Sequence, residues 1–317
     1  MSARRISVNC YAYFSTESCI SQTLLFFAFK QIVYRAAHVF EETALGLQRA
    51  MARFGVHGDA HLLADDQELI DQPLAAEFQD PTHLFVVICD HYFALMPHTY
   101  ILLQLEQLAA FQYLQKHLPD ALVIWEFSSF GLSFLRHVLH MPASYMPAYT
   151  NFEKPAEATS DGSIAVLFFG WIHLRRLPVL QALLNAGVPL TIKELVYGSE
   201  LDEAVREAQI VVNIHRVDSA SLEVHRLNRL LLQGKCIVSE PSSDPILDAI
   251  YSRGVVFAHV GDIVEVLHEL LADPGQRRIW EVNALRLGND LQDNLSPLKQ
   301  GLMLAIDALS QIATPAT

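Results

Sequence analysis

The residues from 164 to 240 constrain the fold of this chain most strongly. An apolar run over residues 164–169 is followed by a turn at Gly170 and by a helical pattern that begins near Arg175 and Arg176. A buried strand that leads into a glycine turn and a helix is the opening of a Rossmann-type unit, in which backbone N–H groups can face a phosphate. The segment therefore predicts a parallel sheet with an anion site at its carboxyl edge.

Short apolar runs alternate with helical patterns along the whole chain, which is typical of α/β proteins with mainly parallel sheets. In the first half we expect strands at 6–14, 24–29, 60–63, 84–89, 100–103 and 121–125, and helices at 39–54, 108–117 and 130–139. In the second half we expect strands at 164–169, 189–193, 209–214, 236–239 and 255–258, and helices at 173–186, 199–208, 221–233, 244–252, 262–272 and 275–288. A last helix is expected over 298–312.

A polar segment at residues 151–162 contains proline and glycine and has no periodicity, which marks a domain boundary. We therefore expect one Rossmann-like domain over residues 1–150, a second over 151–292, and a C-terminal helix and tail over 293–317. Two halves of the same α/β kind imply a cleft between them, where ligands commonly bind.

The composition disfavours several functions. The net charge is -13 with His neutral, and an acidic surface repels polyanions, so we expect no broad nucleic-acid binding, although a local basic pocket for one diphosphate is compatible with it. The four cysteines have no CxxC spacing, and the Asp-His…His group at 90–98 has no firm metal-ligand spacing, so we assign no metal and no disulfide framework.

No apolar run reaches the ~18 residues of a membrane span. We expect a cytoplasmic protein, with peripheral membrane contact left open.

Basic and polar side chains follow the expected strands of the second half. Arg175 and Arg176 come just after the turn at Gly170 and could pair with a diphosphate. Because neighbouring residues of a helix point about 100° apart, we expect only one of the two to face the site. Asn213 and His215 end an apolar strand, and their spacing places them on the same face. The alternative for His215 is a hydrogen-bonded structural role.

Glu223 and Arg226 begin the next helical pattern and share a helix face. In the functional interpretation Glu223 accepts hydrogen bonds from ribose hydroxyls and Arg226 meets a phosphate, whereas the alternative is an ordinary ion pair. Tyr197 and Gly198 are candidates for a nucleobase pocket.

The first half contains candidates for the acceptor side of a reaction. Glu106 follows an apolar strand closely, where a carboxylate could deprotonate a hydroxyl, or simply cap the next helix. Gln104 and Gln107 beside it could bind sugar hydroxyls. His38 precedes a helix, and its imidazole is a candidate general base or an ordinary loop residue. Trp125 ends another strand and either lines a sugar site or packs in the core.

Several segments share their pattern with one group of enzymes: 170–176, 197–202, 208–215, 223–227 and 234–240 in the second half, and 104–107 and 125–128 in the first. This set resembles the GT-B glycosyltransferases, and within them a bacterial glycosyltransferase-like family. The resemblance covers about residues 36–272.

The resemblance implies two Rossmann-like domains that face a cleft. It implies that the second domain binds a nucleotide-diphosphate sugar, with the acceptor (a glycan, lipid-linked sugar, small molecule or protein) on the side of the first. Transfer would need neither a metal nor a resident cofactor, and the last helix would pack back on the first domain. One position departs from the pattern. Many relatives carry Glu five residues before the glycine that Gly234 matches, whereas this chain carries Arg229 at that position. Ribose recognition would then fall to Glu223, or nucleotide binding is altered or lost.

Other functions stay open. A sugar-nucleotide epimerase of the same double-Rossmann design would need acid and base residues on both sides of one sugar carbon and no acceptor. A non-catalytic binding or assembly protein is favoured by Arg229 and by the lack of a clear catalytic carboxylate. A DNA-modifying transferase would need a strongly basic face, which the acidic balance disfavours.

Overall fold

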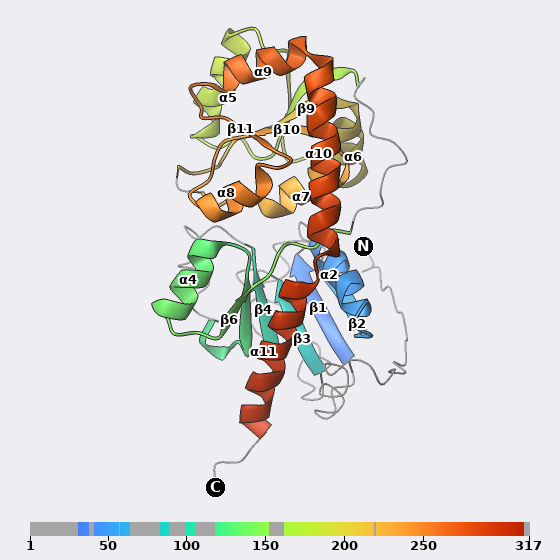
Figure 1. Cartoon of the computed structure of the whole chain (residues 1–317), viewed down its shortest axis with the longest axis vertical. Helices are drawn as coiled ribbons and strands as arrows, with labels where there is room; N and C mark the ends of the chain where they lie inside the picture. Colours follow the sequence, from blue (N-terminus) through green and yellow to red (C-terminus); the bar gives the residue numbers. More distant parts are fainter. Residues whose placement is uncertain are drawn as a thin grey trace. The chain divides into compact units, whose positions relative to one another are not determined.

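The computed structural model describes residues 31–37, 41–56, 58–63, 83–88, 99–105, 118–151, 162–218 and 220–313. The chain divides into two compact units (Figure 1), the first formed by the residues up to Asn151 together with those from Asn294 onward, and the second by Phe152–Asp293. Among the described residues, each unit has one sheet, and every strand pair in it is parallel. The chain is therefore an α/β protein with parallel sheets, as the alternation of its apolar runs predicts.

The sheet of the first unit has the strand order β2-β1-β3-β4-β5-β6. Its strands are β1 (Gln31–Ala37), β2 (Gly58–Leu63), β3 (His83–Ile88), β4 (Tyr100–Gln104), β5 (Val123–Glu126) and β6 (Ala143–Tyr145). The helices that accompany them are α2 (Glu41–Ala52), the 3-10 helix η5 (Leu118–Asp120) and α4 (Ser129–His137). The strands β4 and β5 are buried along their whole length, which accounts for their nearly continuous apolar sequence.

Two strands of this sheet were not predicted. β1 pairs with both β2 and β3, but Gln31 and Arg35 interrupt its apolar pattern, so the sequence did not mark it as a central strand. β6 has only three residues, too few to establish a period. The expected strands at 6–14 and 24–29 and the helix at 108–117 lie outside the described residues.

The helix α11 (Ser296–Ala313) belongs to the first unit and packs against β5 and β6. A Cβ atom at Gly301 would lie 2.7 Å from Nε1 of Trp125, so the helix backbone lies close to the sheet at this point. The hydroxyl of Tyr149 donates a hydrogen bond to the carbonyl of Asn294, 2.9 Å away, just before the helix begins. The end of the chain thus completes the core of a unit that begins near its start.

The sheet of the second unit has the order β11-β10-β9-β7-β8. Its strands are β7 (Ile164–Phe169), β8 (Leu190–Lys193), β9 (Ala208–Asn213), β10 (Cys236–Ser239) and β11 (Val256–Phe257). Its helices are α5 (Arg176–Asn185), α6 (Gly198–Glu207), α7 (Val224–Leu232), α8 (Pro245–Tyr251), α9 (Ile263–Ala272) and α10 (Pro274–Asp293). Every element that the sequence predicts here is present, and α10 is longer than predicted.

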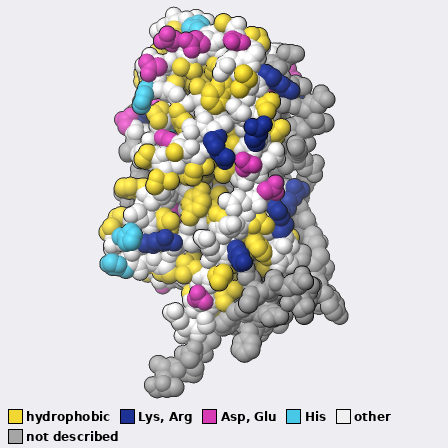
Figure 2. All heavy atoms as spheres, in the orientation of Figure 1, with side chains coloured by type: hydrophobic (Ala, Val, Ile, Leu, Met, Phe, Trp, Pro, Cys, Tyr) yellow, Lys and Arg dark blue, Asp and Glu magenta, His cyan; other side chains and the backbone are white. Residues whose placement is uncertain are grey.

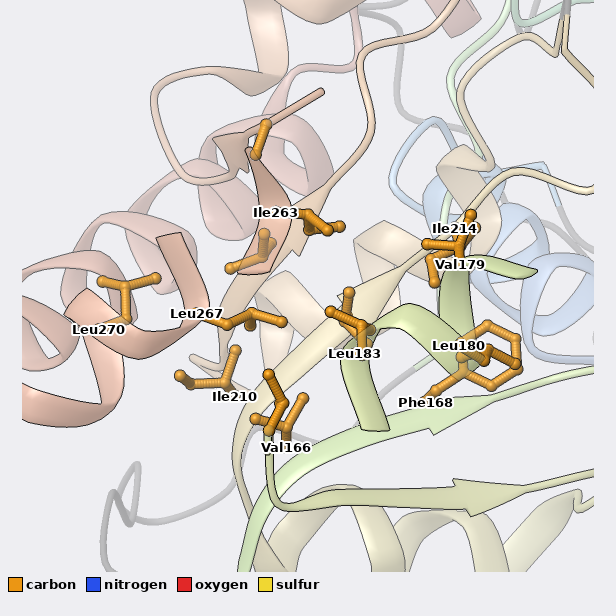
Figure 3. Close-up of a cluster of buried hydrophobic side chains, with 14 of the residues drawn as sticks. Val166, Phe168, Val179, Leu180, Leu183, Ile210, Ile214, Ile263, Leu267 and Leu270 are labelled. Carbon is orange, nitrogen blue, oxygen red and sulfur yellow. The ribbon is translucent and has the colours of Figure 1, made fainter. Parts of the chain in front are cut away.

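One face of the second sheet packs against α5 and α9 (Figure 3). Val166 and Phe168 of β7 and Ile210 of β9 meet Leu183 of α5 and Leu267 of α9 in a fully buried cluster. Alternate residues of a strand share a face, so the intervening residues face the other side. This core holds the carboxyl ends of β7 and β9 next to each other.

Two kinds of feature are absent from the part of the chain that the structure describes. None of its helices has the length and apolar character needed to cross a membrane. No group of three His, Cys, Asp or Glu side chains in it is arranged to hold a metal ion.

We predict that Gly46→Ala destabilises the first unit, although alanine favours helices over glycine by about 1 kcal/mol. In α2 the new Cβ would lie 2.5 Å from the backbone nitrogen of Thr150 and 2.6 Å from the carbonyl carbon of Tyr149. Backbone atoms cannot move aside as a flexible side chain can, so we expect a loss of about 1–3 kcal/mol. Urea unfolding of the full chain measures it.

Gly275→Ala is the matched control. Gly275 is exposed near the start of α10, and its new Cβ would meet only a side-chain oxygen of Asp273, at 3.2 Å. Its stability should be unchanged or slightly raised. Equal stability of the Gly46→Ala variant and the parent chain would contradict the close packing of α2.

Candidate functional site

Polar and charged side chains meet at the carboxyl edge of the second sheet. They come from the ends of β7, β9 and β10, which are neighbours in the sheet, and from the starts of α5 and α7. We call this group the carboxyl-edge site, and its members are Gly170, Arg175, Arg176, Asn213, His215, Glu223, Arg226 and Glu240. Hydrogen bonds and close contacts between these residues connect the group.

A buried ion pair lies at the centre of the site. Arg176 is 2% exposed, and its Nη2 donates to Oε1 of Glu223 at 3.0 Å. Its Nε donates to the carbonyl of Ile214 at 2.8 Å, and its Nη1 to the carbonyl of Trp171 at 2.8 Å. All three guanidinium nitrogens of Arg176 therefore bind protein acceptors. This arginine holds together the segments that follow β7 and β9.

The surroundings shift the pKa of both partners of this pair. Burial lowers the pKa of Arg176 to about 10, and Glu223 opposes that shift. For Glu223, burial raises the pKa, but the charge of Arg226, the hydrogen bond and charge of His215 and the charge of Arg176 outweigh it. The net pKa of Glu223 lies well below its ordinary value, so this carboxylate is ionised throughout the physiological range.

A second ion pair joins Arg175 to Glu240. The pair is bidentate, because Nη1 lies 2.8 Å from Oε2 and Nη2 lies 2.7 Å from Oε1. The remaining Nε donates to the exposed carboxylate of Asp218, and Nη1 also reaches the carbonyl of His215 at 2.9 Å. The hydrogen bond to Glu240 raises the pKa of Arg175 above its ordinary value. The donors of Arg175, like those of Arg176, bind acceptors of the protein.

Glu240 is a member of the site that the sequence reasoning did not single out. It lies directly after β10, and its side chain is 4% exposed. Besides Arg175, its Oε2 accepts a hydrogen bond from the backbone N–H of His215 at 2.7 Å. Like Asn213, Glu240 is a polar residue at the end of a buried strand, a pattern that is visible in the sequence.

Arg226 differs from the other two arginines. Its Nη1 donates to Oδ1 of Asn213 at 2.9 Å, and its guanidinium carbon lies 5.0 Å from the ring centre of Phe169. Asn213 is held in turn, because its Nδ2 donates to Oγ of Ser239 at 3.1 Å. Within the described residues this is the one hydrogen bond of the Arg226 guanidinium, and its side chain is only half-buried. Arg226 therefore has donors available for a ligand.

Gly170 allows Arg226 to lie this close to the backbone. Its φ is 124°, a conformation that other residues rarely adopt, and a Cβ atom here would lie 2.8 Å from Nη2 of Arg226. The guanidinium therefore lies directly against the turn that follows β7. The close approach of a cation to backbone is the kind of geometry for which glycine is needed.

The loop after β7 also carries an exposed aromatic residue. Trp171 is 49% exposed, the guanidinium carbon of Arg216 lies 4.7 Å from its ring centre, and His173 meets its ring edge-on. Figure 2 shows one face of the molecule, on whose described part hydrophobic side chains alternate with Lys, Arg, Asp and Glu side chains.

Three other residues of the second unit have different surroundings. Tyr197 is 55% exposed before α6, and Gly198 begins that helix with φ of 58°; no hydrogen bond within the described residues joins them to the carboxyl-edge site. Arg229 forms an ion pair with Asp202 of α6. The residue that departs from the pattern of the resembling glycosyltransferases thus connects α7 to α6.

The candidates in the first unit are only partly described. Gln104 and Trp125 are both buried, and Gln104 lies beside Glu126 in the pairing of β4 with β5. Glu126 accepts hydrogen bonds from the backbone N–H and the hydroxyl of Ser128, at 2.9 and 2.7 Å. The other candidates, His38, Glu106 and Gln107, lie outside the described residues.

Comparisons with known proteins identify the architecture through structure and not through sequence. No protein-family model matches the chain, and no curated protein has a significant sequence match to it. Sucrose-phosphate synthase from Thermosynechococcus elongatus matches with a TM-score of 0.56 and 12% identity, over 90% of this chain and 98% of that one.

Two further solved structures agree. The DNA-modifying enzyme beta-glucosyltransferase matches with a TM-score of 0.56 and 9% identity, over 87% of this chain and all (100%) of that one. Anabaena HepE, solved in complex with UDP and glucose, matches with a TM-score of 0.55 and 8% identity, over 90% of this chain and 100% of that one. These are GT-B glycosyltransferases. This chain has the GT-B fold. At such low identities the similarity establishes the architecture, two Rossmann-like domains, and confirms the fold class expected from the sequence.

In this GT-B chain we predict that Gly170→Ala is more damaging than Gly198→Ala. Both glycines have positive φ, but a Cβ at Gly198 would meet no atom within 4 Å, whereas one at Gly170 would collide with Arg226. Gly198→Ala should therefore cost only the ordinary left-handed penalty of about 1–2 kcal/mol, and Gly170→Ala clearly more. Thermal and urea unfolding of both variants provide the comparison. Similar losses in the two variants would show that Gly170 is an ordinary turn.

Proposed function

We propose that the chain is a glycosyltransferase that binds a nucleotide-diphosphate sugar at the carboxyl-edge site. The observation that carries the proposal is the guanidinium of Arg226, held by Asn213 and Phe169 against the turn at Gly170. Arginine donors presented beside a glycine turn, at the carboxyl ends of parallel strands, suit a phosphate. The fold supports glycosyl transfer in general.

The three arginines would then have different tasks. Arg175 and Arg176 bind the carboxylates of Glu240 and Glu223, so they fix the site and contribute charge. Arg226 would contact the diphosphate and offset the negative charge that develops on it as the sugar leaves. Cationic side chains can do this without a metal ion, so we propose metal-independent transfer. Unchanged activity in the presence of a chelator is the expected result.

The donor is best sought first among uridine nucleotides. HepE was solved in complex with UDP and glucose, and the beta-glucosyltransferase with uridine diphosphoglucose. For this chain we propose the same class of donor, with Glu223, Tyr197 and Gly198 as the candidates for ribose and base recognition.

The acceptor side is proposed from the sequence and the first sheet. Glu106 follows Leu105 directly after β4, and β4 ends in the buried Gln104. A carboxylate at the carboxyl end of a parallel strand is suitably placed to deprotonate an acceptor hydroxyl. His38 is the second candidate for this role, and Gln107 is a candidate for contacts with the acceptor. Trp125 is fully buried and lies against Gly301 of α11, so we do not propose it as an acceptor contact.

A non-catalytic nucleotide-binding or assembly protein is the second candidate function. One observation favours it: Arg229 stands where many members of the resembling family carry Glu, and it pairs with Asp202 instead. A chain with this change could keep the fold and lose the chemistry. Nucleotide binding without turnover on any acceptor would support this alternative.

We predict that Arg226→Ala weakens the binding of UDP at least tenfold and leaves the binding of uridine nearly unchanged. The reason is that a charge-assisted contact to phosphate contributes about 1.5–3 kcal/mol, whereas the nucleoside carries no phosphate. Isothermal titration calorimetry with both ligands measures the difference.

Arg253→Ala is the control for this prediction, because Arg253 is an exposed arginine of the same unit that pairs with Asp290. It should bind UDP as the parent chain does. Equal effects of Arg226→Ala on UDP and uridine would remove the phosphate role of Arg226.

We also predict that Glu106→Gln lowers turnover on an accepted acceptor about 100-fold, since general-base catalysis typically contributes 10²–10⁴. UDP affinity should stay the same, because the donor site lies in the other unit. Steady-state kinetics and calorimetry together test this. Turnover and acceptor kinetics equal to those of the parent chain would exclude Glu106 from the reaction.

A further inference from the structure

Both ring nitrogens of His215 face hydrogen-bond acceptors. The side chain follows β9 and is 3% exposed. Its Nδ1 lies 3.3 Å from Oε2 of Glu223, and its Nε2 lies 3.1 Å from the backbone carbonyl oxygen of Glu240. The imidazole ring therefore bridges the N-cap residue of α7 and the segment that follows β10.

Neither acceptor can supply a proton. The Glu240 oxygen is a carbonyl, which only accepts. The Glu223 carboxylate is ionised, because Arg176 binds its other oxygen at 3.0 Å. A neutral imidazole has one N–H and one lone pair, so in either tautomer one nitrogen would direct a lone pair at an oxygen. Only the doubly protonated imidazolium donates to both.

We propose that His215 is a positioning residue that carries a positive charge in the folded protein, and that its imidazolium holds Glu223 and the Glu240 carbonyl in place. We further infer that this charge is needed for the carboxyl-edge site to attract an anionic diphosphate, a part that rests on the proposed function. His215 thus acts through its neighbours and not by contact with the ligand.

The charge count of the site supports a protonated His215. The connected side chains are the cations Arg175 and Arg176 and the carboxylates Glu223, Glu240 and the exposed Asp218, so together they carry one negative charge. With a neutral His215, the charge of Arg226 would only cancel this negative charge. The imidazolium cancels it instead and leaves the positive charge of Arg226 in surplus. A surplus of positive charge is what an anion site requires.

The groups that face the ring come from three elements. Glu223 lies at the start of α7, Glu240 lies after β10, and Arg175 lies just before α5. Burial lowers the pKa of His215, but the hydrogen bond and charge of Glu223 and the charge of Glu240 outweigh burial and the opposing charge of Arg175. The net pKa of His215 is raised, in agreement with the geometry.

The charge of His215 makes the stability of the folded protein depend on pH. A histidine whose pKa is raised on folding contributes stability that is complete below the unfolded pKa of ~6.5 and is lost as the pH rises through the folded pKa. Over the same window the affinity for an anionic ligand should fall. Both properties should therefore decline together above neutral pH.

The decisive experiment is nitrogen NMR on the full chain labelled with ¹⁵N-histidine, at about pH 7.5, one unit above the ordinary pKa of ~6.5. We expect both ring nitrogens of His215 to show the shifts and attached protons of an imidazolium. An unprotonated nitrogen signal for His215 would overturn the proposal. Through-bond correlation to the backbone assigns the ring, so the result does not depend on a variant that folds.

A second measurement compares His215→Gln with the parent chain. A glutamine side chain does not titrate, so the decline of melting temperature above neutral pH should become shallower in the variant. The control His259→Gln, at an exposed histidine of the same unit, should keep the slope of the parent chain. An unchanged slope in His215→Gln would also contradict a charged His215.

UDP titrations of the same proteins test the link to binding. We expect the UDP affinity of the parent chain to fall several-fold between pH 6 and about pH 9, with a smaller fall for His215→Gln. Equal slopes would contradict the electrostatic part of the inference. If the parent chain binds no UDP at any pH, the proposed function fails, while the NMR experiment still decides the charge of His215.

Discussion

The buried pair of Arg176 and Glu223 is the interaction on which the site depends. Removing the carboxylate of Glu223 would leave Arg176 buried without a charged partner, which typically costs 3–5 kcal/mol. The pair does more than neutralise itself, because Arg176 also binds the carbonyls of Ile214 and Trp171. It therefore fixes the segments after β7 and β9 and the start of α7 in one arrangement. Arg226, three residues after Glu223, owes its place to that arrangement.

The site separates cations that bind protein from a cation that is available to a ligand. Arg175 and Arg176 have all their guanidinium nitrogens on protein acceptors, so their geometry is fixed before any ligand arrives. Arg226 has one hydrogen bond within the described residues and a half-buried side chain. Preorganised positive charge of this kind requires little rearrangement when negative charge develops, which is the main electrostatic device of enzyme sites. His215 extends the same network, and its two acceptors leave it only one consistent protonation state.

The sequence predicted the second unit better than the first. In the second unit each strand is a short apolar run and each helix has a helical periodicity of apolar residues. The local sequence patterns were therefore sufficient to predict these elements. In the first unit β1 is central but contains Arg35, and only its pairing with β2 and β3 identifies it. The site residues were also only partly predictable from the sequence. Asn213 and Arg226 were predicted because a polar residue at the end of a buried strand or at the start of a helix is visible in the local sequence. Glu240 follows β10 in the same way, but only its contacts with Arg175 and His215 identify it as part of the site.

By itself the sequence determined the α/β class, the elements of the second unit and the short list of residues near its carboxyl edge, because hydrophobic period and strand ends are local properties. Only the tertiary structure decided which of those residues bind one another. Arg175 and Arg176 are adjacent in sequence, yet one pairs with Glu240 and the other with Glu223, residues 65 and 47 positions away. The strand order of the sheet decides which chain segments lie together, and so which group pairs with a buried charge. No single segment of the sequence determines that strand order.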